Sequence, residues 1–86
     1  MPRISEFYGI AIYLYYDDHA PPHFHAIYAG SEALMGIDPV RIIEGNLPRR
    51  ASSLVIEWAG VYREELMADW LLAREHEPLR PIPPLD

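Results

Sequence analysis

The chain has 86 residues, of which 50% are hydrophobic, and a formal net charge of −6 without a single cysteine or lysine. A chain of this length and composition forms one domain around a packed core, and the absence of cysteine excludes disulfides and thiolate metal ligands. The acidic charge argues against non-specific binding to nucleic acid, because phosphate contacts come mainly from Lys and Arg, and leaves open only a site-specific contact.

Four segments have the composition and the period-two alternation of β-strands. They are residues 9–16, 23–29, 32–37 and 40–44. Gly30-Ser31 and Asp38-Pro39 predict turns between them. Because such short connections favour antiparallel neighbours, we expect a small antiparallel meander of three to four strands.

The second half of the chain has helical periodicity. Apolar residues recur at spacings of three and four at Ala51, Leu54, Val55, Trp58, Tyr62, Leu66, Trp70 and Ala73. The pattern predicts one long amphipathic helix from about Pro48 to about Glu75, bent or weakened at Gly60. The expected fold is therefore α+β, with a single domain over residues 1–76 and a proline-rich C-terminal tail over residues 77–86 that forms an extended arm on or off the surface.

The first predicted strand is apolar or aromatic on both faces. One face carries Ile10, Ile12 and Leu14, with Tyr16 continuing the series, and the other carries Tyr13 and Tyr15. A single helix covers only one face of a sheet, and an uncovered aromatic face is unusual on a monomer. Either a second copy or a small partner protein binds through Tyr13 and Tyr15, or residues 4–8 and the tail fold over this face.

Chemically versatile side chains concentrate in one segment, residues 17–25, with the sequence Asp-Asp-His-Ala-Pro-Pro-His-Phe-His. His23 and His25 point the same way on a strand because side chains alternate. His19 precedes a corner stiffened by two prolines, which could bring it back toward that pair.

Two kinds of site suit this segment. His19, His23 and His25, with an aspartate as a further ligand or an orienting partner, match the ligands of zinc or another divalent transition metal. Alternatively, two neighbouring histidines share base and acid roles, as phosphodiester cleavage requires. A purely structural interpretation is also open, in which the histidines cap the turn and bond backbone groups exposed by the prolines.

The sequence also resembles a known family. Several segments are similar to the bacterial domain of unknown function numbered four-one-six-zero. The main one is Asp18-His19-Ala20-Pro21-Pro22-His23-Phe24-His25-Ala26. The others are Ile4-Ser5-Glu6-Phe7 before it and Leu47-Pro48-Arg49-Arg50-Ala51, Glu57-Trp58-Ala59 and Arg63-Glu64-Glu65-Leu66 after it. The resemblance implies a small bacterial protein, often encoded beside another small domain in arrangements similar to toxin–antitoxin modules.

Three functions are compatible with these observations. The first is a nuclease or hydrolase in a toxin–antitoxin-like pair, with His23 and His25 as catalytic residues, His19 as a third member and Asp18 orienting one imidazole. The second is a non-catalytic regulatory or interaction subunit. The third is a transition-metal-binding domain. No apolar run approaches the roughly 20 residues that cross a bilayer, and the start lacks the hydrophobic stretch of a signal peptide, so we expect a cytoplasmic protein without membrane contact.

Overall fold

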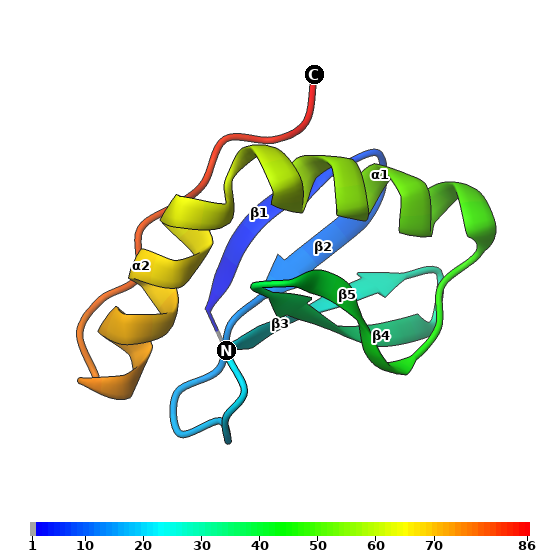
Figure 1. Cartoon of the computed structure of the whole chain (residues 1–86). Helices are drawn as coiled ribbons and strands as arrows, with labels where there is room; N and C mark the ends of the chain where they lie inside the picture. The colour runs from blue at the N-terminus through cyan, green and yellow to red at the C-terminus, as the bar shows by residue number, and fades with distance from the viewer. Residues whose placement is uncertain (1) are drawn as a thin grey trace.

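A computed structural model describes residues 2–86 and has an α+β fold, with one antiparallel sheet and a layer of helices (Figure 1). Its elements follow one another as β1 (Arg3–Phe7), β2 (Ile10–Tyr13), β3 (His23–Tyr28), β4 (Ser31–Ile37), β5 (Val40–Gly45), α1 (Arg49–Val61) and α2 (Arg63–Arg74). Among the described residues, neither helix combines the length and the apolar character needed to span a bilayer.

The sheet is a five-stranded meander in the order β1-β2-β3-β4-β5, so the expected three to four strands were too few. The additional strand is β1, in the segment for which we considered folding over the face of Tyr13 and Tyr15. It pairs with β2 through a two-residue turn in which Tyr8 and Gly9 both have positive φ. Ala29 and Gly30 form the same kind of turn between β3 and β4. Such turns match the twist of the strands that they join.

Alternation along the strands separates a buried face from an open one. Helices lie on one face only (Figure 1), and that face carries Ile10, Ile12, Phe24, Ala26, Ala33 and Met35, all of them fully buried. Tyr13, opposite His25 in the register of β2 and β3, lies on the other face. Tyr16 is exposed instead of continuing the buried series, because β2 ends at Tyr13 and the period of two ends with it.

The predicted long helix is two helices, which corrects the expectation of a single one. Tyr62 separates them with φ −109° and ψ 29°, and its N–H still bonds the carbonyl of Trp58. Gly60, the weakest helix former in this region, lies two residues before the break. Most of the predicted stripe is buried on both helices, so the break redirects the apolar stripe around the sheet without interrupting it.

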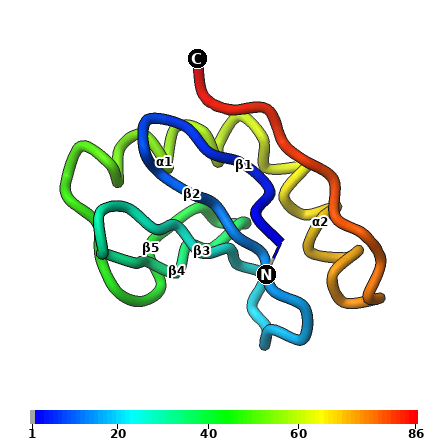
Figure 2. The backbone as a smooth tube through the Cα atoms, turned by 180° about the vertical axis from the view of Figure 1, so that it is seen from behind, coloured from blue at the N-terminus to red at the C-terminus, as the bar shows by residue number. Residues whose placement is uncertain are grey.

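The C-terminal tail runs along the helices and the edge of β1 (Figure 2). The hydrogen bonds that hold it include Arg80 N–H to Asp69 Oδ1 at 3.0 Å, Ile82 N–H to the carbonyl of Ile4 at 2.8 Å, and Trp58 Nε1–H to the carbonyl of Pro83 at 2.8 Å. Ile82 is buried. Because β1 lies within the sheet and the tail is bound to β1 and the helices, neither covers the face that carries Tyr13 and Tyr15.

Candidate functional site

The candidate site lies where the chain leaves β2 and returns as β3. Residues 14–22 form a loop beyond the ends of these strands (Figure 1), and β3 then begins at His23. Period two places His23 and His25 on one face of β3, as the sequence predicts, and their ring centroids are 5.2 Å apart. Both residues are buried, at 6% and 9% exposure, beneath the loop.

Asp18 connects the two imidazoles. Its Oδ2 atom is 3.1 Å from Nε2 of His25 and 3.3 Å from Nε2 of His23. One ligand atom from each of these three residues lies within 4.8 Å of the other two. A tetrahedral ion with bonds of about 2.0–2.1 Å holds its ligand atoms about 3.3 Å apart, so the spacing around Asp18 is suitable for a small divalent cation.

Each imidazole is also held through its other nitrogen. Nδ1 of His23 is 2.8 Å from the carbonyl oxygen of Pro21, to which it must donate. Nδ1 of His25 is 3.0 Å from Oε2 of Glu32. A carbonyl or carboxylate on the second ring nitrogen is the usual partner of a metal-binding histidine. The contact between Nδ1 of His23 and the Pro21 carbonyl is the backbone bond that a purely structural role predicts, but it involves only one nitrogen of one ring.

Aromatic side chains fix the orientation of both rings. Tyr15 packs its ring edge against His25 at 4.3 Å between centroids, and Trp70 from α2 packs against His23 at 5.3 Å. Burial raises the pKa of the Tyr15 phenol, and the charges of Glu32, Tyr13 and Asp18 raise it further. Tyr15 therefore stays a neutral phenol at neutral pH, and its partner Tyr13 stacks on it at 6.2 Å.

The loop and the open face of the sheet enclose a pocket of 260 Å³ beside this cluster. Leu34 and Ile43 form its apolar wall, and the rest of the lining is Asp18, His19, Ala20, Pro21 and both buried histidines. His19 itself is exposed and does not belong to the group of converging ligand atoms. Among the described residues the converging ligand atoms belong to Asp18, His23 and His25, and His19 lines the pocket instead.

Two residues of the site were not predicted. The position of Glu32 follows from the strand register. A two-residue turn at Ala29-Gly30 sets the pairs His25↔Leu34 and Ile27↔Glu32. Glu32 therefore lies diagonally beside His25 on the same face of the sheet. Trp70 was expected in the core, and its helical spacing gives no sign of the contact with His23.

The family of the chain follows from its sequence. The model of the domain of unknown function DUF4160 matches residues 9–71, which include the whole histidine segment, the sheet from β2 onward and most of both helices. The chain belongs to this family. No curated protein and no solved structure matches it. The DUF4160 assignment names no reaction, so the geometry of Asp18, His23 and His25 must support any functional proposal.

Proposed function

We propose that this DUF4160 domain binds a divalent transition metal through Nε2 of His23, Nε2 of His25 and Oδ2 of Asp18, and that the centre serves metal-assisted hydrolysis. Glu32 and the Pro21 carbonyl orient the two imidazoles. Two imidazoles and one carboxylate are an established ligand set for zinc and for non-haem iron.

The supporting observation is the orientation of two imidazoles toward one oxygen atom of Asp18. All four ring nitrogens of His23 and His25 face oxygen atoms that accept hydrogen bonds: Pro21 O, Glu32 Oε2 and Asp18 Oδ2. In the neutral tautomer that donates from Nδ1, each imidazole carries its lone pair on Nε2, and this neutral form is the one that binds a metal. Both Nε2 lone pairs then point at a carboxylate oxygen, an arrangement that a cation placed between the three atoms stabilises.

The open side of the cluster favours a reactive role over a structural one. Structural zinc sites are closed by four protein ligands, whereas catalytic sites use three and keep a position for water or substrate. Here three side chains converge beside a 260 Å³ pocket. A divalent metal in such a position lowers the pKa of water and polarises the bond to be hydrolysed.

The metal-free alternative, in which His23 and His25 act as acid and base, receives less support. Such a site presents free ring nitrogens to a substrate. In this protein the Nδ1 atoms face Pro21 and Glu32, and both Nε2 atoms face Asp18. Acid–base catalysis would therefore require the substrate to displace Asp18.

Metal titration tests the proposal. Chelator-treated protein without an affinity tag is titrated with Co²⁺, followed by visible absorption, and with Zn²⁺ in equilibrium dialysis. We expect one equivalent to bind, and expect His23→Gln and His25→Gln to abolish binding because each removes one nitrogen ligand. Wild-type protein that binds neither metal would overturn the proposal.

Two matched variants identify the ligands. His19→Gln removes the imidazole that the loop leaves outside the cluster, and should bind metal as the wild type does. His76→Gln removes an exposed histidine that pairs with Asp17 at 3.0 Å, and serves as the control for loss of any imidazole. If His19→Gln lost metal binding while His76→Gln kept it, His19 would belong to the ligand set in place of Asp18.

A second candidate function, protein interaction, is favoured by the stacked Tyr13 and Tyr15 on the sheet face that the helices and tail leave open. Tyr13→Asp introduces a charge into that face and should convert a self-associated form to a monomer in light scattering after size exclusion, with His19→Gln as the control. A wild-type monomer would count against association through this face. The toxin–antitoxin-like role implied by the family resemblance stays a prediction.

A further inference from the structure

A second pocket adjoins the candidate metal centre. Its volume is 320 Å³, and its lining consists of Asp17, Asp18, His19, Ala20 and Arg74. It shares Asp18, His19 and Ala20 with the pocket beside the two buried histidines. A molecule bound there therefore lies next to the carboxylate that the proposed metal would use.

The charged side chains that line this second pocket differ in whether an ionisable side chain of the protein already contacts them. Asp17 pairs with His76 at 3.0 Å, and Asp18 faces the two buried imidazoles. Arg74, in contrast, forms no ion pair within residues 2–86 and is exposed. The positive charge that faces a ligand in this pocket is thus the guanidinium of Arg74, together with the metal when it is bound, beside the carboxylates of Asp17 and Asp18.

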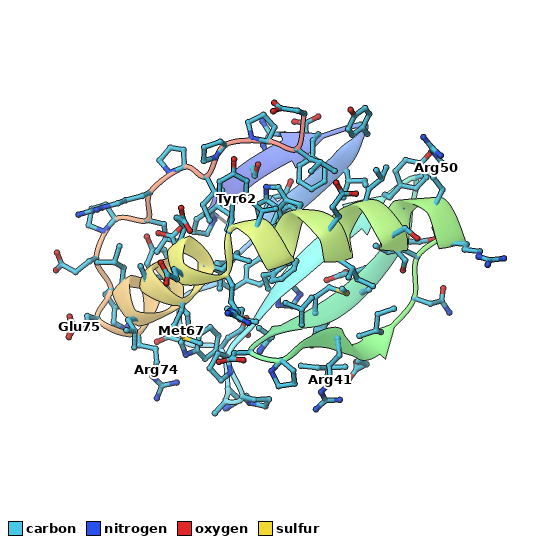
Figure 3. The ribbon with its side chains drawn as sticks, turned by 45° about the horizontal axis from the view of Figure 1, so that its top comes forward. Arg41, Arg50, Tyr62, Met67, Arg74 and Glu75 are labelled. Atoms are coloured by element: carbon cyan, nitrogen blue, oxygen red, sulfur yellow. The ribbon has the colours of Figure 1, made fainter. Side chains whose placement is uncertain are left out.

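Arg74 is also held in place relative to the site. Its guanidinium carbon lies 5.8 Å from the centroid of the Trp70 ring, within the range of a cation–π contact, and the same ring packs against His23. Arg74 is at the C-terminal end of α2, far from Arg50 at the start of α1 (Figure 3). Trp70 therefore connects the arginine to a metal ligand through two ring contacts.

We propose that this pocket binds the phosphate group of a small phosphate ester, the substrate of the metal centre. The inference rests on the proposed function. Arginine binds phosphate through two parallel N–H bonds, and a metal beside it attracts the same anion. Pockets of 260 and 320 Å³ suit a small molecule. The net charge of −6 and the lack of lysine oppose a polynucleotide.

The reaction would be hydrolysis of a phosphate monoester. The water oxygen forms a bond to phosphorus while the bond between phosphorus and the ester oxygen breaks, and that electron pair leaves on the ester oxygen. One proton of the water is transferred to this oxygen to give an alcohol, and the other stays on the phosphate product. The step needs no oxidant, reductant or third reactant.

The test measures metal and phosphate separately. Metal affinity is first determined for the wild type, Arg74→Gln and Arg63→Gln, the last a control that removes another exposed arginine of α2. All three should agree, because no arginine is a ligand. The affinity for inorganic phosphate is then measured by calorimetry, with and without Zn²⁺.

We expect Arg74→Gln to weaken phosphate binding about tenfold, as loss of a charge-assisted hydrogen bond predicts, and Arg63→Gln to leave it unchanged. For hydrolysis of p-nitrophenyl phosphate, the same change should raise KM more than it lowers kcat. Equal phosphate affinity in the wild type and Arg74→Gln overturns this inference, even where metal binds normally.

Two further outcomes separate the proposals. A wild type that binds no metal but binds phosphate in an Arg74-dependent way overturns the metal centre and supports the anion pocket. Cleavage of a single-stranded RNA oligonucleotide without hydrolysis of the monoester overturns the assignment to small esters.

Discussion

Asp18 and Asp69 show how differently one small domain uses two carboxylates. Asp18 lies on a loop, its side chain is 25% exposed, and its Oδ2 faces two imidazoles beside a pocket. Asp69 lies on α2 at 1% exposure, and its Oδ1 accepts one hydrogen bond from the Arg80 N–H. Its Oδ2 has no hydrogen-bond partner in the described part of the chain. Asp18 is the candidate for chemistry because two imidazoles converge on it and a pocket adjoins it, whereas Asp69 only holds the tail in place.

The pKa of Asp69 agrees with this contrast. Burial raises it above its ordinary value of 3.8, and the hydrogen bond and charge of Arg80 lower it by less. The charged form is therefore disfavoured in the folded state. A carboxylate with this property costs free energy of folding at neutral pH, so the role that its contacts support is positioning the tail through the Arg80 N–H and not net stability.

The largest effect should come from replacing each carboxylate by its amide and measuring Co²⁺ affinity. Asp18→Asn removes a proposed ligand and should weaken binding by more than about 100-fold, because loss of an outer-shell partner alone costs about 10–100-fold. Asp69→Asn should bind Co²⁺ as the wild type does. Equal affinity in the two variants would remove the distinction between the carboxylates.

A smaller effect is expected from Glu32→Gln. The amide oxygen can still accept the proton on Nδ1 of His25, so the ring stays oriented but loses a negative neighbour. We expect Co²⁺ affinity to fall about tenfold, at the low end for outer-shell changes. Glu44→Gln, an exposed carboxylate on β5, serves as the control. An unchanged Co²⁺ affinity in Glu32→Gln would show that metal binding by His25 does not require a carboxylate at its Nδ1 atom.

Asp69→Asn should also change stability in a pH-dependent way. Because the folded-state pKa is raised, the wild type is penalised at neutral pH, and the penalty disappears as the pH falls through the folded pKa toward the unfolded value of 3.8. We expect the variant to be more stable by about 1 kcal/mol at pH 7, with the difference shrinking on acidification. Urea unfolding at several pH values measures it. A constant difference would mean that Asp69 does not titrate as described.

The smallest effect concerns Ser5, whose buried Oγ also has no hydrogen-bond partner among the described residues. Ser5→Ala removes a polar group without creating a large cavity, so the free energy of unfolding should change by less than about 0.5 kcal/mol. Thermal unfolding followed by circular dichroism measures this change. A substantial loss of stability would reveal a hydrogen bond at Ser5 and set it apart from Asp69.

Periodicity predicted most of the fold and the shared face of His23 and His25. Alternation identified β2 to β5 and the side of the sheet on which His23 and His25 lie, and the apolar stripe identified the buried face of the helices. β1 was missed because its five residues include Ser5 and Glu6 and because Tyr8-Gly9 is not among the strongest hairpin signals. The helix break at Tyr62 depends on one residue's backbone angles, for which Gly60 gives only a weak indication.

Sequence reasoning placed Asp18 beside an imidazole, but for another reason it could not show that Asp18 joins the pair of histidines while His19 does not. Both residues lie on the loop between β2 and β3, where neither period two nor helical period relates side chains to one another. Asp17 has φ +66°, a conformation unusual for a residue other than glycine, and no periodicity of the sequence predicts it. The residues of the site were therefore predictable as a segment, but not as a ligand set.

The three proposed ligands lie within eight consecutive residues, from Asp18 to His25. An ion bound to them closes a very short ring of chain, and closing so short a ring removes little freedom from the unfolded polypeptide. Metal loading should consequently contribute little to global folding, in contrast to zinc fingers, which need the ion in order to fold. We therefore expect the apo protein to reach its native topology before it acquires an ion.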